Sequence, residues 1–155
     1  MNDSTKRVAI VGSGPAAFYS AMELLRHDDP MVSVDMLERL PTPYGLVRGG
    51  VAPDHEKIKS VTKIFERAAG HPRFRFFGNV EFGKDIQRLD LLQRYHAVIY
   101  AFGSRTDRHL NIIGETLKGS HAATEFVGWY NGQPDYRHHQ FDLTSKRVAI
   151  IGMGN

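Results

Sequence analysis

The chain contains no cysteine. It therefore has no disulfide, no thiolate metal site, no cysteine nucleophile and no dithiol pair of the kind that disulfide reductases use. No apolar run approaches the roughly 20 residues of a membrane-spanning helix, so we expect no membrane insertion. The opening MNDSTKRVAIVGSG lacks the apolar segment of about 7–15 residues that marks a signal peptide, and we expect a cytoplasmic protein.

The excess of positive over negative charge is also small. Twenty Lys and Arg residues face 17 Asp and Glu residues, which gives a net charge of +3 with no block of like charges. This balance gives little reason to expect a nucleic-acid partner. The pair His138 and His139 has no partner at helical spacing, so we expect no metal site. The hydrophobic share of 41% in 155 residues is typical of one globular domain, or of one domain plus a fragment.

The first 38 residues have the pattern of a strand, a glycine turn, a helix and a second strand. Residues 8–11 are a continuous apolar run, as in a strand buried on both faces of a parallel sheet. Residues 16–26 have apolar side chains at helical spacing, and residues 32–38 predict the second strand. The fold class is therefore α/β, with a Rossmann-like parallel sheet.

The turn between the first strand and the helix carries a dinucleotide-binding fingerprint, Gly12-x-Gly14-x-x-Ala17. Gly12 permits the tight turn, Gly14 lets the backbone approach a pyrophosphate, and Ala17 lets the helix pack closely on the strand. Pro15 and Ala16 lie at the helix N-terminus, where unpaired N–H groups attract an anion. The alternative is a glycine turn with a purely structural role.

Glu38 lies at the end of the second predicted strand, 24 residues after Gly14. A carboxylate there can accept hydrogen bonds from both ribose hydroxyls of an adenosine and would repel a 2′-phosphate. The site therefore favours FAD or NAD over NADP. The alternative for Glu38 is a solvated charge at a strand end. Arg39 is a second candidate for the ligand, although a surface charge is the simpler interpretation.

Residues 39–53 contain three prolines and three glycines, and we expect no regular structure there. A segment this long indicates backbone shaped against a large planar ligand, with Tyr44, Gly45 and Leu46 beside a flavin ring. An ordinary surface loop is the alternative.

A helix is expected from about residue 54, with Asp54 as its cap. One face of this helix is expected to carry Ile58, Val61, Thr62, Phe65 and Ala69. His55 is the catalytic candidate, because a helix N-terminus disfavours a charged imidazole and so suits hydrogen bonding or proton relay. A structural or solvated histidine is the alternative. The row Lys59, Lys63 and Arg67 is either the solvated face of this helix or a docking surface for an acidic protein.

Further along, short strands are expected at 74–77 and 97–102. Gly103 ends the latter and would allow a ligand to approach the carboxyl edge of the sheet. A helix capped by Ser120 is expected to run to about residue 131, followed by a polar linker over 131–145.

The chain contains one internal repeat. Residues 6–15, KRVAIVGSGP, and residues 146–155, KRVAIIGMGN, match at seven of ten positions. The second copy predicts the first strand and glycine loop of another nucleotide-binding unit, which includes Gly152, Gly154 and Asn155. The expected domains are thus 1–130, the linker 131–145, and the start of a second unit over 146–155.

Several motifs in order resemble one family. They are VAIVGSGPAAFYSAMELL, VDMLERLPTPYGLVRGGVAPDHEKIKSV, RFRFFGNVEFGKDI, YHAVIYAFGSRTDRHLNIIGE, EFVGWYNGQPD and VAIIGMGN. Together they are similar to the adrenodoxin reductase-type ferredoxin–NADP reductases, within the glutathione reductase-like flavoproteins. The resemblance covers essentially all 155 residues. Its most specific part is LPTPYGLVRGGVAPDH.

The resemblance implies an enzyme that takes a hydride from NADPH onto FAD and passes single electrons to an iron–sulfur ferredoxin, expected to be acidic. It places the glycine loop at the FAD pyrophosphate, Glu38 at the ribose and Leu46 at the flavin. Val80 or Phe82 would meet the adenine through backbone bonds, and His55 would lie beside the flavin. Gly152, Gly154 and Asn155 would begin the NADPH phosphate loop.

Family members are longer than this chain. The resemblance therefore implies an incomplete FAD-binding domain followed by the first strand of an NADPH-binding Rossmann unit. We expect the chain by itself to bind FAD weakly and not to oxidise NADPH. The alternative function is a non-catalytic FAD- or adenine-nucleotide-binding module or gene fragment, and the sequence leaves the oligomeric state open.

Overall fold

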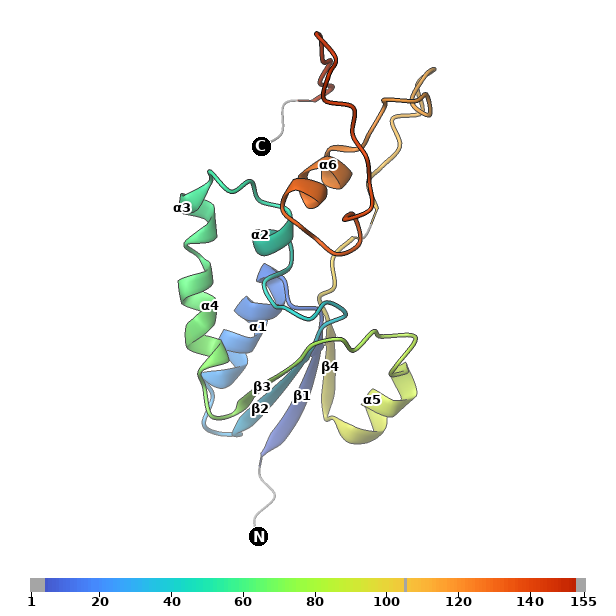
Figure 1. The fold of residues 1–155 in the computed structure, drawn as a ribbon. Helices are drawn as coiled ribbons and strands as arrows, with labels where there is room; N and C mark the ends of the chain where they lie inside the picture. Colours follow the sequence, from blue (N-terminus) through green and yellow to red (C-terminus); the bar gives the residue numbers. More distant parts are fainter. Residues whose placement is uncertain (1–4, 105, 153–155) are drawn as a thin grey trace.

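A four-stranded parallel sheet forms the centre of the molecule (Figure 1). The computed structural model describes residues 5–104 and 106–152. The strand order is β3-β2-β1-β4. The strands are β1 (Lys6–Val11), β2 (Val32–Leu37), β3 (Phe74–Phe77) and β4 (Ala97–Tyr100).

The pairing register aligns the carboxyl ends of the strands. Val11, the last residue of β1, pairs with Leu37 of β2 and with Tyr100 of β4. Leu37 in turn pairs with Phe77, the last residue of β3. Segments that follow the strands therefore meet at one edge of the sheet, where ligands of open α/β sheets bind.

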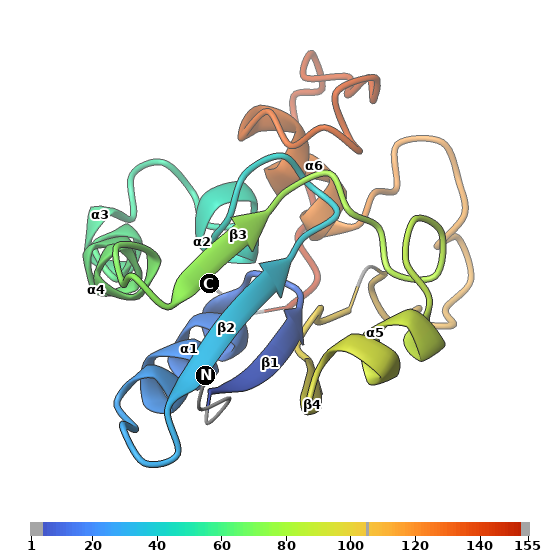
Figure 2. The ribbon, with the colours of Figure 1, turned by 90° about the horizontal axis from the view of Figure 1, so that it is seen from below.

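Helices cover both faces of the sheet (Figure 2). On one face lie α1 (Pro15–Leu25) and α4 (Thr62–Ala69), and on the other lies α5 (Arg88–Arg94). Aromatic packing joins the two helices on the first face. The rings of Phe18 on α1 and Phe65 on α4 stack with centroids 4.9 Å apart, and both residues are fully buried. On the α5 face, Leu91 is fully buried against Ala9, Val11 and Leu37.

The predicted α/β class, the parallel sheet and the first helix are confirmed. The expectation that residues 39–53 hold no regular structure is wrong, because a short helix α2 (Gly45–Gly49) forms there. Helix α2 begins at Tyr44 and Gly45, which both have positive φ. The buried side chain of Val47 packs this helix onto the core.

The helix expected from residue 54 is two helices, α3 (Glu56–Lys59) and α4. Asp54 does not cap it, because His55 takes the N-cap position and no side chain caps the turn. The expected apolar face is also shifted, since Ala68 rather than Ala69 is buried. Ile58, expected on the same face, lies on α3 before the break at Ser60 and Val61 and is 46% exposed.

Two further differences concern helix starts. Helix α6 (Ala123–Tyr130) begins after Ala122, so the expected cap at Ser120 is wrong. Helix α5 was not expected, although its start carries a signal: the Asp90 carboxylate accepts the Gln87 N–H at 2.8 Å. A reciprocal side chain three residues after the N-cap is a common helix start.

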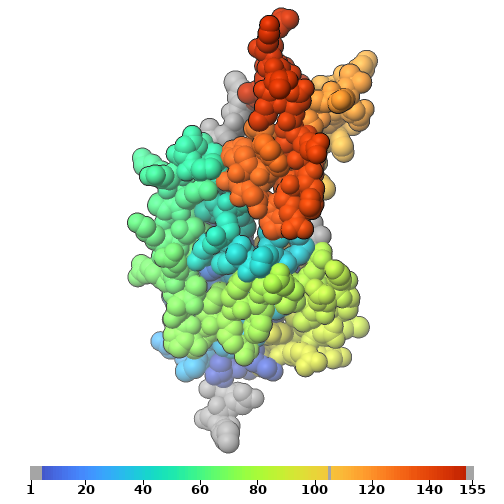
Figure 3. Space-filling view, in the orientation of Figure 1, coloured from blue at the N-terminus to red at the C-terminus, as the bar shows by residue number. Residues whose placement is uncertain are grey.

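Residues 131–145 form no helix or strand but pack against α6 beyond the carboxyl edge of the sheet (Figure 3). The Phe141 ring lies 5.1 Å from the rings of Phe126 and Trp129. The strand predicted at the second repeat is absent from the described residues up to 152, where Val148 is 81% and Ile150 is 87% exposed. A strand requires a neighbour for its backbone groups, and no described strand lies beside this segment.

No helix in residues 5–104 and 106–152 is long and apolar enough to cross a membrane.

Candidate dinucleotide-binding site

The first glycine of the fingerprint fits tightly between two strands. Gly12 has φ +104°, a conformation that side chains disfavour. Its N–H donates to the Leu37 carbonyl at 2.8 Å, and a Cβ there would lie 2.5 Å from the Ala101 carbonyl oxygen. Gly12 is thus required where the chain leaves β1 between the ends of β2 and β4.

The second glycine opens onto free space. Gly14 is the N-cap of α1 with φ −77°, and a Cβ built on it would meet no atom within 4 Å. Pro15 and Ala16 beside it are exposed, while Ala17 is fully buried under the helix. The N–H groups of Ala16 and Ala17 have no carbonyl partner within the helix. The structure therefore offers an open cradle with backbone donors at a helix N-terminus, which fits a pyrophosphate.

Glu38 lies directly against this loop. Its Oε2 accepts the Ser13 hydroxyl at 2.7 Å, and its Oε1 accepts the Leu40 N–H at 2.9 Å. The two bonds fix both carboxylate oxygens beside the glycine turn. A ribose held there would offer hydroxyl donors to a group that only accepts.

The segment after β3 runs beside Glu38. The Val80 N–H donates to the Glu38 carbonyl at 2.9 Å, so this N–H is occupied. An adenine could therefore meet the carbonyl of Val80 but not this N–H. Phe82 instead packs on the α5 side of the sheet, with its ring 5.2 Å from that of Tyr100.

Arg39 is paired with a residue 96 positions away. Its Nη1 and Nη2 donate to the Asp135 oxygens at 2.8 and 2.6 Å. The hydrogen bond to Asp135 raises the pKa of the Arg39 guanidinium above its ordinary value, against the opposing effect of burial. Arg39, a candidate ligand contact in the sequence, therefore has both terminal nitrogens bonded to Asp135.

The proline- and glycine-rich segment packs on the glycine loop. The Tyr44 N–H donates to the Ser13 carbonyl at 3.0 Å, and a Cβ at Gly45 would lie 2.9 Å from the Gly14 Cα. Leu46 follows on α2 and is 64% exposed. The structure thus packs the proline- and glycine-rich segment on the glycine loop, and the exposed Leu46 follows directly after that contact.

His55 lies between α2 and α3, at the start of α3. Its carbonyl accepts the N–H groups of Ile58 and Lys59, both at 3.1 Å, while its ring is half exposed. The ring Nδ1 lies 3.9 Å from the nearer Asp54 oxygen. The backbone of His55 starts the helix, and its side chain remains available for another role.

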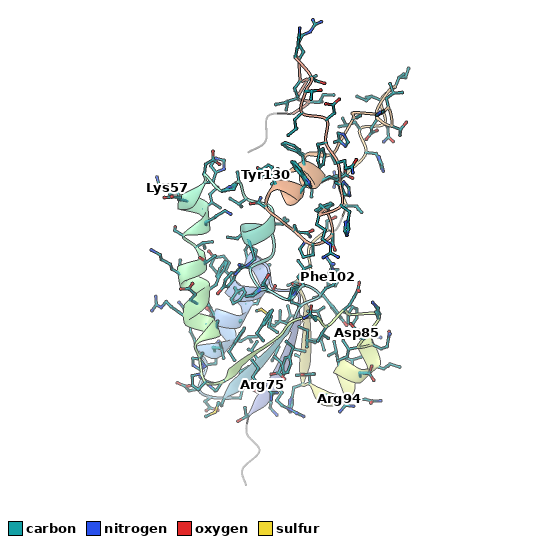
Figure 4. All side chains as sticks on the ribbon, in the orientation of Figure 1. Lys57, Arg75, Asp85, Arg94, Phe102 and Tyr130 are labelled. Atoms are coloured by element: carbon teal, nitrogen blue, oxygen red, sulfur yellow. The ribbon has the colours of Figure 1, made fainter. Side chains whose placement is uncertain are left out.

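The end of β4 borders the same edge. Phe102 lies beyond the strand, between the sheet and α6, while Arg75 lies on the sheet (Figure 4). Gly103 follows at φ +68°, with open space where a Cβ would be. Gly152 is exposed at φ +122° in the segment without a strand, and Gly154 and Asn155 lie outside the described residues.

Several contacts that shape the site carry no signal in the sequence. Ser13 occupies a variable position of the fingerprint, Leu40 contributes only its backbone, and Asp135 lies in a polar stretch. All three lie within the motifs that carry the family resemblance, but nothing in those motifs shows which residues they contact. Each acquires its role through the fold that brings it to Glu38 or Arg39.

Fold and site together define a dinucleotide-binding α/β unit. The model of the pyridine nucleotide-disulphide oxidoreductase family matches residues 6–155, and the chain belongs to this family. The family description names a disulphide, and the 155 residues of this chain contain no cysteine that could form one.

Known proteins resemble the chain over nearly all of its length. It is 57% identical over 152 residues to the NADPH-ferredoxin reductase FprA of Mycobacterium leprae, covering 96% of this chain and 33% of that protein. It is 47% identical to the mitochondrial NADPH:adrenodoxin oxidoreductase of Drosophila melanogaster, covering 97% and 32%. The chain thus spans about a third of the length of these curated relatives.

The solved structures agree with the sequence relatives. Mycobacterium tuberculosis FprA in complex with NADPH superimposes with a TM-score of 0.82 at 57% identity. The match covers 86% of this chain and 30% of that one.

Proposed function

We propose that this chain forms the N-terminal part of the FAD-binding unit of a flavoprotein that passes electrons from NADPH to a ferredoxin-type iron–sulfur protein. The observation that carries the proposal is the Glu38 carboxylate, held by Ser13 beside the open cradle at Gly14. The names of the relatives, NADPH-ferredoxin reductase and NADPH:adrenodoxin oxidoreductase, support it. Residues 131–145 would link this unit to an NADPH-binding unit that begins at 146–155.

Each part of the site has a task in holding FAD. Gly14 and the first turn of α1 bind the pyrophosphate, and Glu38 accepts the ribose hydroxyls. The carbonyl of Val80 accepts from the adenine amine. Leu46 provides an apolar contact for the ring system. When bound, the flavin accepts a pair of electrons and releases them one at a time.

His55 and the charged surface are assigned to electron delivery. The half-exposed His55 ring supplies a hydrogen bond at the flavin end of the site without holding the fold. The proposed partner is an acidic iron–sulfur protein, which the net charge of +3 and the exposed Lys63 and Arg67 of α4 favour; Lys59, expected in the same row, lies on α3 and is half-buried.

The proposal is tested by measuring which flavin the protein binds and how tightly it retains it. Heat should release FAD, and not FMN, from a polypeptide of the relatives' length that contains this chain. Glu38→Ala should weaken FAD retention by about 1–3 kcal/mol, because charged hydrogen bonds are lost. Glu23→Ala, which removes an exposed α1 carboxylate paired with Arg26 and His27, away from the glycine loop, is the matched control. Release of FMN, or equal retention by both variants, would contradict the proposal.

One observation favours a second candidate, a non-catalytic adenine-nucleotide-binding module. The first glycine loop is fully formed, whereas the second repeat forms no strand in the described residues and its Ile151 is 71% exposed. NADPH oxidation distinguishes the two functions. If a polypeptide as long as the relatives binds FAD but does not oxidise NADPH, the non-catalytic module is the correct function.

A further inference from the structure

Ser13 is a buried polar residue inside the glycine fingerprint. Its relative exposure is 1%, and its hydroxyl donates to Glu38 Oε2 at 2.7 Å. Its carbonyl accepts the Tyr44 N–H at 3.0 Å. One residue therefore connects the first strand's turn, the carboxylate after the second strand and the loop that precedes α2.

The bonds leave the Glu38 carboxylate ready for two more donors. A carboxylate has about four lone-pair sites, two on each oxygen. Ser13 uses one site on Oε2, and the Leu40 N–H uses one on Oε1. One site remains on each oxygen, which matches the two adjacent hydroxyls of a ribose.

Within residues 5–104 and 106–152, no cation donates a hydrogen bond to the Glu38 carboxylate, although the Arg39 charge acts on it at longer range. Arg39, the nearest arginine in sequence, gives both terminal nitrogens to Asp135. The orientation of the Glu38 carboxylate is thus set by one hydroxyl and one backbone N–H. The backbone N–H is present whatever the side chain at position 40, so Ser13 is the residue whose side chain decides the orientation.

We propose that Ser13 is a positioning residue for ribose recognition, which holds the Glu38 carboxylate in the rotamer that accepts both ribose hydroxyls. The proposal rests on the proposed function, because it needs an adenosine ribose at this site. Without the Ser13 hydroxyl, the carboxylate can turn about its last side-chain bonds, and the ordering has to occur on binding.

The experiment compares ADP with 2′-deoxy-ADP, titrated into the chain and followed by NMR chemical shifts. Wild type should prefer ADP by about tenfold, the equivalent of one charged hydrogen bond. Ser13→Ala should reduce that preference to about two- to threefold, and Glu38→Gln should reduce it similarly. In the double variant, Ser13→Ala should add little to Glu38→Gln, because the two residues act as a unit.

The preference is a ratio measured on one sample, so a smaller folded fraction does not change it. Ser60→Ala, which removes an exposed hydroxyl bonded to the Lys57 carbonyl, is the control and should keep the wild-type ratio. If wild type and Ser13→Ala prefer ADP equally, the positioning role is overturned while the proposed function stands. If wild type binds neither nucleotide, the proposed function fails and the positioning role fails with it.

Discussion

Arg39 and Asp135 form a two-point ion pair between the end of β2 and the segment after α6. The Nη1–Oδ1 and Nη2–Oδ2 distances are 2.8 and 2.6 Å. Asp135 also accepts the Gln133 side chain at 3.2 Å, which fixes the local turn. The pair therefore fastens the 131–145 segment beside the residues that follow Glu38.

Asp135→Asn should loosen this attachment. Backbone amides of residues 133–139 should exchange hydrogen faster, while the free energy of unfolding falls by no more than about 1 kcal/mol, because the pair is partly exposed. Hydrogen exchange followed by mass spectrometry measures the effect. Asp142→Asn, which removes a carboxylate charge bonded only locally to Thr144, should leave the exchange of 133–139 unchanged. Equal exchange in the two variants would contradict the role of the pair.

The two glycines of the fingerprint should respond differently to alanine. Gly12→Ala combines a φ of +104° with a Cβ only 2.5 Å from a backbone oxygen, so the free energy of unfolding should fall by about 1–3 kcal/mol or more. Gly14→Ala has φ −77° and free space, so stability should change by no more than about 0.5 kcal/mol.

The added methyl at Gly14 fills the cradle, and nucleotide binding should therefore be lost without loss of fold. Thermal denaturation and ADP titration of both variants check this contrast. Normal ADP affinity in Gly14→Ala would mean that the pyrophosphate lies elsewhere.

The sequence predicts the sheet and the glycine turn because these features are local and strongly patterned. Residues 8–11 are continuously apolar, and Gly12 and Gly14 follow at the spacing of a dinucleotide-binding turn. The split between α3 and α4 was missed because a break near Ser60 carries no glycine or proline. The roles of Ser13 and Asp135 were missed for a different reason. Their partners, Glu38 and Arg39, are 25 and 96 residues away, and only the fold brings them together.

The buried carboxylate of Asp35 is expected to make the stability of the sheet depend on alkaline pH. Asp35 on β2 accepts Arg75 at two points, 2.7 and 2.6 Å, and the Tyr95 hydroxyl at 2.8 Å. Burial and the hydrogen bond to Asp35 raise the pKa of Tyr95 to about 12. The protonated phenol is favoured by the fold, so its stabilising effect is complete below about pH 10 and is lost as the pH rises towards 12.

Wild type should therefore be more stable than Tyr95→Phe at pH 9 by about 1 kcal/mol, the value of one hydrogen bond. The difference should shrink between pH 10 and 12. Urea denaturation at several pH values measures it, with Tyr130→Phe as an exposed tyrosine control. A difference that stays constant to pH 12 would show that the Tyr95 hydroxyl does not carry the effect.

His55→Gln should affect electron delivery and not the fold. The backbone of His55 starts α3, its ring is half exposed, and no side-chain bond caps the helix. In a polypeptide of the relatives' length, NADPH-driven ferredoxin reduction should fall while bound FAD and the melting temperature stay nearly unchanged. His138→Gln, in the polar segment, is the control. Loss of flavin or unfolding in His55→Gln would assign His55 a structural role.

The chain of 155 residues taken by itself should bind FAD weakly and should not oxidise NADPH. The cradle at Gly14 and the Glu38 carboxylate are formed, so the adenosine half of FAD has its contacts. The other glycine repeat is not preceded by a strand, because Val148 and Ile150 are more than 80% exposed. A glycine loop binds a pyrophosphate only where a strand and a helix hold it in place.

Titration of the chain with FAD, followed by addition of NADPH, separates the two sites. We expect FAD to bind only slightly more tightly than ADP, because the main contacts hold the adenosine half and Leu46 adds a single exposed apolar contact. We expect no bleaching of the flavin absorbance by NADPH. FAD binding far tighter than ADP binding would show that residues 1–155 also hold the ring system. Bleaching by NADPH would place a working nicotinamide site within these residues, and the assignment of that site to the second repeat would be wrong.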